Sequence, residues 1–256
     1  MRPMQRLASS ARVPALAGIL LIVILAVLLE LLTRSNVISP FTIPPPSDIL
    51  ASVPRLFREE HLFRLFLVTF GVILAATALC VVIGIPLGLL LYVKRDLGRA
   101  YESWLGAAFS APFILLYPVF LVVLGRGLQT VAVMSFIAGV TPVILSTYRG
   151  FRGVPNVYLR VATSFNMPQR EVYWKVMIPA ALPSIFTGIR LTLIYAMINV
   201  VAIEFLMAIG GLGFLVGNLY DRYDIPGMYA AVVFVIITSI LFFFGIDKGE
   251  KWLKRL

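Results

Sequence analysis

The sequence contains very little of what disulfides, metal sites and nucleophilic enzymes are built from. There is one cysteine and one histidine in 256 residues. Cys80 lies inside an apolar run and has no second cysteine to pair with, and His61 stands outside any spaced ligand motif. A disulfide framework, a zinc site and a Cys/His nucleophile therefore have no residues to form them. We expect this chain to bind no metal and no cofactor of its own.

Charged residues are also scarce. They make up 13% of the chain, apolar residues make up 60%, and the mean hydropathy is +0.97. A soluble domain has about 25% charged and roughly 45–50% apolar residues. The composition therefore predicts an integral membrane protein whose surroundings are lipid. The net charge of +10 does not indicate a nucleic-acid partner, because the basic residues flank the apolar runs, as membrane orientation requires.

Six apolar stretches approach or exceed the length of about 20 residues that a helix needs to cross a bilayer. They cover residues 15–33, 66–91, 104–124, 128–147, 182–209 and 228–246. We predict an all-α fold with six transmembrane helices in a single domain over 1–256. The first stretch follows a short basic start, like a signal peptide, but no small-x-small cleavage site follows it. We interpret it as a retained first span.

Several spans carry glycine or proline. Gly84 and Gly88 have the small-residue spacing that lets two helices approach closely. Pro112 and Pro118 interrupt the third span, and Pro142 lies inside the fourth. In lipid, the carbonyl groups that a proline frees must find partners on neighbouring helices or in a cavity. These positions are a weak indication of a pathway through the membrane.

The distribution of basic residues predicts the orientation. With six spans and the N-terminus inside, 15 of the 22 lysines and arginines lie on the inner side and six on the outer side. The inner residues are Arg2, Arg6, Arg12, Lys94, Arg95, Arg99, Arg149, Arg152, Arg160, Arg170, Lys175, Lys248, Lys251, Lys254 and Arg255. The outer residues are Arg34, Arg55, Arg58, Arg64, Arg126 and Arg222. This bias predicts that both termini and the loop over 148–181 are cytoplasmic.

Inside that loop, residues 158–183 form a polar and basic island between apolar runs. The pattern predicts a short helix over 158–165, closed by Asn166 in the left-handed conformation. Pro168 then fits the first turn of a second helix. We expect that helix to stop before Pro179, because a residue before proline disfavours the α region. On the outer side, Ser47 in the proline-rich segment over 35–62 is predicted to cap a short amphipathic helix.

The island resembles the EAA loop of binding-protein-dependent ABC importer permeases. Residues 160–162 occupy the E-A-A positions, Asn166 occupies the glycine position, and Met177-Ile178-Pro179 with Ala180-Ala181-Leu182-Pro183 close the motif. Further features of the nitrate, sulfonate and taurine branch follow in order over about residues 40–250. They are Ile43-Pro44 with Pro46-Ser47, Gly84-Ile85-Pro86-Leu87-Gly88, Thr187-Gly188-Ile189-Arg190, Glu204 and Gly211-Leu212-Gly213.

The resemblance implies a type I ABC importer permease that is not itself an enzyme. No G-x-x-x-x-G-K-[ST] motif is present, so ATP hydrolysis is expected in a separate ATPase subunit. The loop would dock on that subunit through Arg160, Val161, Ala162, Asn166, Met167, Pro168, Glu171 and Pro179. An external substrate-binding protein and a second permease subunit, in a homodimer or as the other half of a permease pair, are the other partners it implies.

Two residues of the motif depart from the family pattern. Arg160 replaces the acidic residue and Val161 replaces the first alanine. Asn166 in place of glycine is a milder change, since asparagine also tolerates the left-handed conformation. The departures indicate either weaker docking or an ATPase partner with compensating charge.

Three polar residues in the fifth span are candidates for the translocation pathway. Glu204 lies deep in the span, where a charge costs roughly 2.5–3.5 kcal/mol on insertion scales. It either lines the pathway or forms a structural pair inside the bundle. Asn199 lies near it in sequence, and Arg190 lies near the cytoplasmic end, where it can extend toward the interface.

Two other classes of function are alternatives to the importer. A transporter or channel driven by an ion gradient would be favoured by an inverted repeat, and none is clear in the sequence. An intramembrane enzyme would need a Ser/His or paired-carboxylate constellation in the spans. The residues leave the solute open among nitrate, sulfonates, taurine, thiamine-precursor pyrimidines and riboflavin, the solutes carried in this branch.

Overall fold

The chain folds into a set of long helices. The computed structural model describes residues 4–253, with side chains described from 17 to 248, so that Arg2, Lys254 and Arg255 lie outside the described residues. Within this range, all regular structure is helical, which confirms the all-α prediction. The helices are α1 (Met4–Arg34), α2 (Pro46–Arg58), α3 (Leu62–Val93), α4 (Arg95–Ser110), α5 (Tyr117–Leu124), α6 (Leu128–Arg152), α7 (Asn156–Ser164), α8 (Gln169–Glu171), α9 (Ile178–Met207), α10 (Leu212–Asp221) and α11 (Ile225–Leu253).

Five of these helices are long and apolar enough to cross a membrane, namely α1, α3, α6, the helix that contains α9, and α11. A sixth span is obtained when α4 and α5 are taken together as one bent unit. The two are separated by a short 3₁₀ turn, Phe113–Leu116, and meet at an angle of 78°. The stretch predicted as one span over 104–124 is therefore a broken helix.

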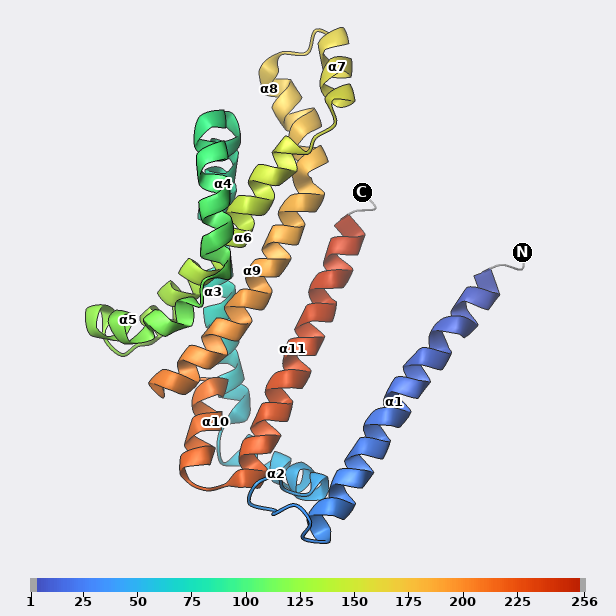
Figure 1. The fold of residues 1–256 in the computed structure, drawn as a ribbon, viewed down its shortest axis with the longest axis vertical. Helices are drawn as coiled ribbons and strands as arrows, with labels where there is room; N and C mark the ends of the chain where they lie inside the picture. Colours follow the sequence, from blue (N-terminus) through green and yellow to red (C-terminus); the bar gives the residue numbers. More distant parts are fainter. Residues whose placement is uncertain (1–3, 254–256) are drawn as a thin grey trace.

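The break follows from the proline at position 112. Ala111, the residue before it, has the extended conformation (φ −75°, ψ 135°) that a following proline imposes. α4 therefore ends at Ser110, and α5 runs sideways from the bundle (Figure 1). α4 also begins earlier than predicted, at Arg95, because its first two turns are amphipathic and lie outside the apolar stretch.

The centre of the bundle is formed by α3, α6 and α9, which lie against one another along most of their length. α3 and α6 approach closely at the two predicted glycines. A methyl group added at Gly84 would stand 2.9 Å from the Val143 side chain, and one at Gly88 would stand 2.6 Å from the carbonyl oxygen of Ile144 and the side chain of Thr147. The prediction of close helix packing over Gly84 and Gly88 is confirmed.

Buried apolar clusters lie at three levels of the bundle. The central cluster joins α3, α6 and α9 through Val72, Ile73, Val131, Met134, Leu193, Ala196, Val200, Ile203 and Met207. One end cluster joins α2, α3, α10 and α11, and the opposite one joins the end of α6 to the start of α9. Figure 1 shows α2 and α10 together at one end and α7 and α8 at the other, which agrees with their predicted separation into outer and inner loops.

The glycine contact between α3 and α6 generates a test of the packing. We expect Gly88→Ala to destabilise the protein by about 1–3 kcal/mol, since the added methyl would overlap backbone and side-chain atoms of α6. Gly71→Ala, in the same helix, is the matched control, because nothing lies within 4 Å of its added methyl. The measurement is the melting temperature in detergent. Equal melting temperatures for the two variants would contradict the close approach.

Candidate functional site

The predicted docking loop is a helical hairpin at the end of the molecule opposite α2 and α10 (Figure 1). α7 ends at Ser164, and Asn166 takes the left-handed conformation with φ of 49°. The N–H groups of Asn166 and Met167 then donate to the carbonyl oxygens of Thr163 (2.9 Å) and Ala162 (3.1 Å), which satisfies the end of the helix. The predicted closure at Asn166 is confirmed. Pro168 caps α8 rather than lying within its first turn.

The second half of the hairpin continues into the membrane without a break. The chain forms α8, then one π-helical stretch over Val172–Met177, and then α9. The prediction that the helix stops before Pro179 is wrong. Pro179 has no N–H to donate and its ring crowds the preceding turn, and the wider π-helical turn before it accommodates both. The hairpin and the span α9 therefore form one continuous helical rod.

Large apolar side chains are exposed on the surface of the hairpin. They are Val157, Tyr158, Val161, Phe165 and Trp174, which are 50–76% exposed. Ala162 is buried, so its small side chain lets α7 pack on the rest of the hairpin. Arg160 is exposed and forms no ion pair within the part of the chain that the structure describes. Glu171 pairs with Lys175 at 2.7 Å along its own helix.

Glu204 lies at the other end of α9 and is fully buried. Its carboxylate accepts hydrogen bonds from the hydroxyl of Thr69 on α3 (2.9 and 3.0 Å) and from the N–H of Gly213 at the start of α10 (3.1 Å). The Thr69 oxygen in turn accepts from the N–H of Leu212 at 2.8 Å. The cluster thus caps the N-terminus of α10, where a carboxylate is favoured by the free N–H groups.

The glycines around Glu204 are required by this contact. A side chain at Gly211 would occupy the position of the carboxylate, and one at Gly213 would overlap the backbone of Val201. Gly211 also has φ of 132°, a conformation that side chains disfavour. The Gly211-Leu212-Gly213 segment therefore leaves room for the Glu204 carboxylate, and it forms the beginning of α10.

The outer end of α9 is held by a second long-range cap. The guanidinium of Arg126, in the turn between α5 and α6, donates to the carbonyl oxygens of Met207 (2.7 Å) and Ala208 (2.8 Å). These are among the carbonyl groups that the end of a helix leaves without a partner. A cation at this end is also favoured by the helix dipole. α9 is thus fixed at its outer end on two sides.

The structure does not bring the three pathway candidates together. Arg190 pairs with Asp247 of α11 at 3.5 Å, and its guanidinium lies 4.5 Å from the ring centre of Phe243. Asn199 donates to the carbonyl oxygen of Tyr195 in its own helix. Asn199 lies nine residues from Arg190, which places the two on opposite faces of α9 at about 100° per residue. Each candidate therefore has its own surroundings.

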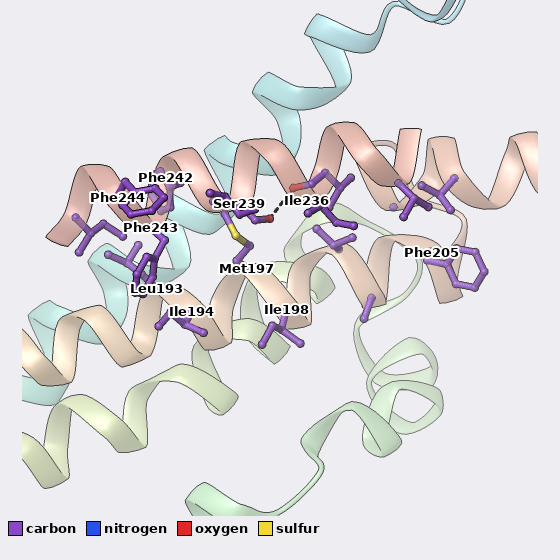
Figure 2. A pocket seen from close by; sticks show the side chains of 18 of the residues that line it. Leu193, Ile194, Met197, Ile198, Phe205, Ile236, Ser239, Phe242, Phe243 and Phe244 are labelled. Atoms are coloured by element: carbon purple, nitrogen blue, oxygen red, sulfur yellow. Dashed lines mark hydrogen bonds between the residues drawn. The ribbon is translucent and has the colours of Figure 1, made fainter. Parts of the chain in front are cut away.

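A large apolar cavity lies between α9 and α11 (Figure 2). Its volume is about 1050 Å³, and its lining includes Leu193, Met197, Phe205, Ile236 and Phe242. Figure 2 shows Met197 and Ile236 in the space between the two helices. Its one polar side chain is Ser239, whose hydroxyl donates to the carbonyl oxygen of Val235. The cavity therefore offers almost no hydrogen-bonding groups to a polar solute.

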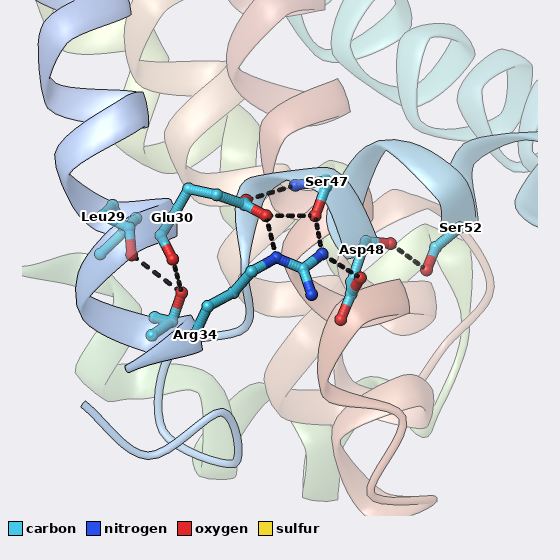
Figure 3. Close-up of polar contacts among 7 residues, drawn as sticks. Leu29, Glu30, Arg34, Ser47, Asp48 and Ser52 are labelled. Carbon is cyan, nitrogen blue, oxygen red and sulfur yellow. Dashed lines mark hydrogen bonds and ion pairs between the residues drawn. The ribbon is translucent and has the colours of Figure 1, made fainter. Parts of the chain in front are cut away.

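α1 stands apart from the bundle and is joined to it chiefly through α2 (Figure 1). Figure 3 shows the junction. The carboxylate of Glu30 accepts from the N–H (3.0 Å) and hydroxyl (2.7 Å) of Ser47 and from Arg34 Nε (2.6 Å). Arg34 also lies 3.8 Å from Asp48. The prediction that Ser47 caps α2 is wrong, because Ser47 lies inside the first turn and Glu30 caps that turn from another helix.

Several of these residues were missed by reasoning from the sequence. Thr69, Arg126 and Glu30 act on partners 17 to 143 positions away, and no local pattern marks them. The one feature of the sequence that could have indicated the Glu204 cluster is the pair of glycines, Gly211 and Gly213, that follow it by seven and nine residues. Within the described residues, no group of three or more histidine, cysteine, aspartate or glutamate side chains could hold a metal ion.

Comparisons with known proteins agree with the arrangement. Residues 62–255 match the family described as binding-protein-dependent transport system inner membrane component. The formylaminopyrimidine transport permease protein ThiX of Halalkalibacterium halodurans is 28% identical over 94% of this chain and 97% of that protein. The taurine transport system permease protein TauC of Escherichia coli is 27% identical over 84% and 80%. A bicarbonate transport system permease protein, CmpB of Synechocystis, is 26% identical over 77% and 70%.

Two solved structures share the fold. Both are chains of the MetNI methionine ABC transporter in inward-facing conformations. One aligns with a TM-score of 0.65 at 23% identity, covering 75% of this chain and 95% of that chain. The other aligns with a TM-score of 0.62 at 24% identity, covering 73% and 93%. The type I importer permease fold predicted from the sequence is confirmed.

The Glu204 cluster generates a second test. Glu204→Ala should destabilise the protein by about 2–5 kcal/mol, because it opens a cavity and leaves the Thr69 hydroxyl and the Gly213 N–H without a partner. Glu59→Ala, at an exposed carboxylate, is the control and should melt like the wild type. Glu204→Gln keeps the size of the side chain. Loss of transport by a well-folded Gln variant would assign Glu204 to the pathway, and loss of folded protein would assign it to structure.

Proposed function

We propose that the inner hairpin of this chain couples it to a separate ATPase subunit. The premise is that the chain belongs to the family of binding-protein-dependent transport system inner membrane components and is the permease subunit of an ABC importer. The observation that carries the proposal is the continuity of the hairpin with α9. One helical rod runs from Gln169 at the hairpin to Met207 at the outer end. A displacement of the hairpin by an ATPase would move this rod as a unit.

The surface of the hairpin supports a protein partner. Four apolar side chains, Val157, Val161, Phe165 and Trp174, are at least half exposed on a segment that the charge distribution assigns to the cytoplasm. Apolar and aromatic side chains that project together from a polar segment are typical of an interface that another protein buries. The loop residues Arg160, Asn166, Met167, Pro168 and Glu171 surround them.

Arg160 supports an ATPase partner adapted to this chain. It occupies the position where the family has an acidic residue, it is exposed, and it has no carboxylate partner within the described residues. Burying an unpaired guanidinium at an interface would be costly. We therefore place an acidic side chain of the ATPase opposite Arg160, with charge opposite to the usual arrangement.

The outer end is the proposed docking side for a substrate-binding protein. α2 and α10 form a platform there, held by ion pairs between Arg55 and Asp224 and between Arg222 and Glu60 (2.5 Å). Hydrogen bonding to the Asp224 carboxylate raises the pKa of Arg55. Two ion pairs across the platform keep it rigid, as a surface that receives a partner needs to be. This assignment places both termini in the cytoplasm.

Two apolar surfaces, one on α1 and one between α9 and α11, support a dimer of this chain. Over residues 19–28, α1 is apolar on all sides, and its large side chains there are about half exposed or more. The apolar cavity between α9 and α11 has no helix of the same chain inside it. We propose that α1 of each copy packs over the α9–α11 cavity of the other, which closes a two-fold symmetric pair.

The solute is proposed to be small and polar, like those in the names of the related permeases. The relative with the broadest coverage here transports a formylaminopyrimidine, so this class is the first to test. In the same proposal Glu204 acts as a structural anchor, because its carboxylate is fully buried against Thr69 and α10. Specificity would then come mainly from the binding protein.

The coupling proposal predicts the effect of changes at the tip of the hairpin. Replacing Asn166, Met167 and Pro168 should abolish substrate-stimulated ATP hydrolysis of the assembled importer and leave membrane insertion intact. Phe165→Ala should lower recovery of the ATPase in a detergent pull-down, since that ring is 76% exposed at the tip. Phe41→Ala, at an 83% exposed ring in the outer loop, is the matched control. Unchanged stimulation in the tip variant would contradict the coupling role.

The dimer proposal predicts a specific cross-link. Leu25 and Ile236 lie about 14 and 17 Å from the outer ends of α1 and α11, at 1.5 Å per residue, and are therefore at similar depth. In a Cys80→Ser background, two differently tagged copies carrying Leu25→Cys and Ile236→Cys should form a disulfide-linked dimer in membranes. Leu25→Cys with Leu74→Cys, at an exposed and depth-matched position on α3, is the control. Equal cross-linking of both pairs would contradict the proposed packing.

A further inference from the structure

A second cavity lies at the inner edge of the membrane, away from the coupling tip. Its volume is about 400 Å³, and it is enclosed by the ends of α3 and α6 and the starts of α4 and α7. The rings of Tyr92 and Phe151, with centres 5.5 Å apart, and the side chain of Leu159 form an apolar part of its wall. Arg95, Arg99 and Arg152 form the basic part.

The charges around this cavity are unequal. Arg152 and its neighbour Arg149 share the carboxylate of Glu102, at 2.9 and 3.0 Å, and Arg99 pairs with Asp96 at 3.0 Å. Arg95 forms no ion pair with any residue that the structure describes. Of the three arginines that line the cavity, two pair with a carboxylate outside its lining, one of which is shared with Arg149, so the cavity keeps an excess of positive charge.

Orientation in the membrane explains why basic residues are on this side, but it does not explain why they surround a cavity. The positive-inside bias acts on whole loops and needs no particular arrangement of side chains. Here three guanidinium groups from two helices line one space with an apolar wall. Guanidinium groups bind phosphate oxygens through paired N–H donors, which gives this arrangement a chemical preference.

The level of the cavity identifies the source of such a phosphate. The apolar run of α3 ends at Val93, and Lys94 and Arg95 follow at once, so the arginines lie where lipid headgroups lie. Basic pockets between spans on the cytoplasmic side are suited to anionic headgroups. We propose that this cavity binds the phosphate headgroup of an anionic phospholipid, with the arginines on the phosphate and the ring wall against the glycerol and the first acyl carbons.

Such a lipid would act on the coupling hairpin as well as on the bundle. Leu159 belongs to α7, and Phe151 packs in the apolar cluster at the base of the hairpin. A headgroup in the cavity would therefore join α3, α4 and α6 to the first helix of the hairpin. The inference goes beyond the importer function, because it holds for the permease chain whether or not an ATPase is bound.

The test is native mass spectrometry of the detergent-purified full chain with phosphatidylglycerol and with phosphatidylcholine of the same acyl chains. The wild type should retain phosphatidylglycerol in preference. The double variant Arg95→Gln/Arg99→Gln should lose this preference by roughly tenfold or more, from the attraction that each basic side chain contributes at a membrane surface. Arg58→Gln/Arg64→Gln removes the same charge from exposed outer positions and should bind like the wild type.

Each result bears on the proposal. The headgroup site would be supported if the control variant keeps the preference for phosphatidylglycerol and the cavity variant loses it. Size-exclusion profiles establish that both variants are folded. Equal losses in the two double variants would show that general charge, and not the cavity, attracts the lipid. No preference for phosphatidylglycerol in the wild type would also overturn the lipid assignment.

Discussion

Hydrocarbon offers no hydrogen-bond partners, and the outer half of this permease depends on that constraint. Every helix that ends near the membrane leaves N–H or carbonyl groups that must be satisfied within the protein. The chain does this with charged side chains from distant segments. Glu204 caps α10, Arg126 caps α9, and Glu30 caps α2. The three contacts thus satisfy the ends of two short helices, α2 and α10, and of the long span α9.

The same contacts give α9 its mechanical character. Its outer end is fixed by Arg126 and by the Glu204 cluster, and its inner end continues through a π-helical turn into the hairpin. Close packing against α3 and α6 supports its middle. One continuous helix thus joins the hairpin to the Glu204 and Arg126 contacts at the other end of α9.

Much of this could be predicted from the sequence, and the failures have physical reasons. Hydropathy predicts the long helices. Asn166 closes a helix through its own local conformation, and Gly84 and Gly88 recur at a regular spacing along one helix, so both features were predictable. Pro179 was misjudged because a proline that ends an isolated helix can be accommodated by a wider turn when the helix is held on both sides. Ser47 was misjudged because the cap of α2 comes from Glu30, in another helix. Pathway residues stay predictions, since a pathway shared by two copies is not visible in one chain.

The measurement that tests the central claim most directly is ATP hydrolysis by the importer assembled in lipid nanodiscs. The permease is co-expressed with the genes next to it, purified, and assayed with and without the substrate-binding protein and its solute. The account predicts that an ATPase subunit co-purifies, that the loaded binding protein stimulates hydrolysis, and that changing the tip of the hairpin at Asn166 removes the stimulation. A permease that purifies alone and transports its solute without ATP would contradict it.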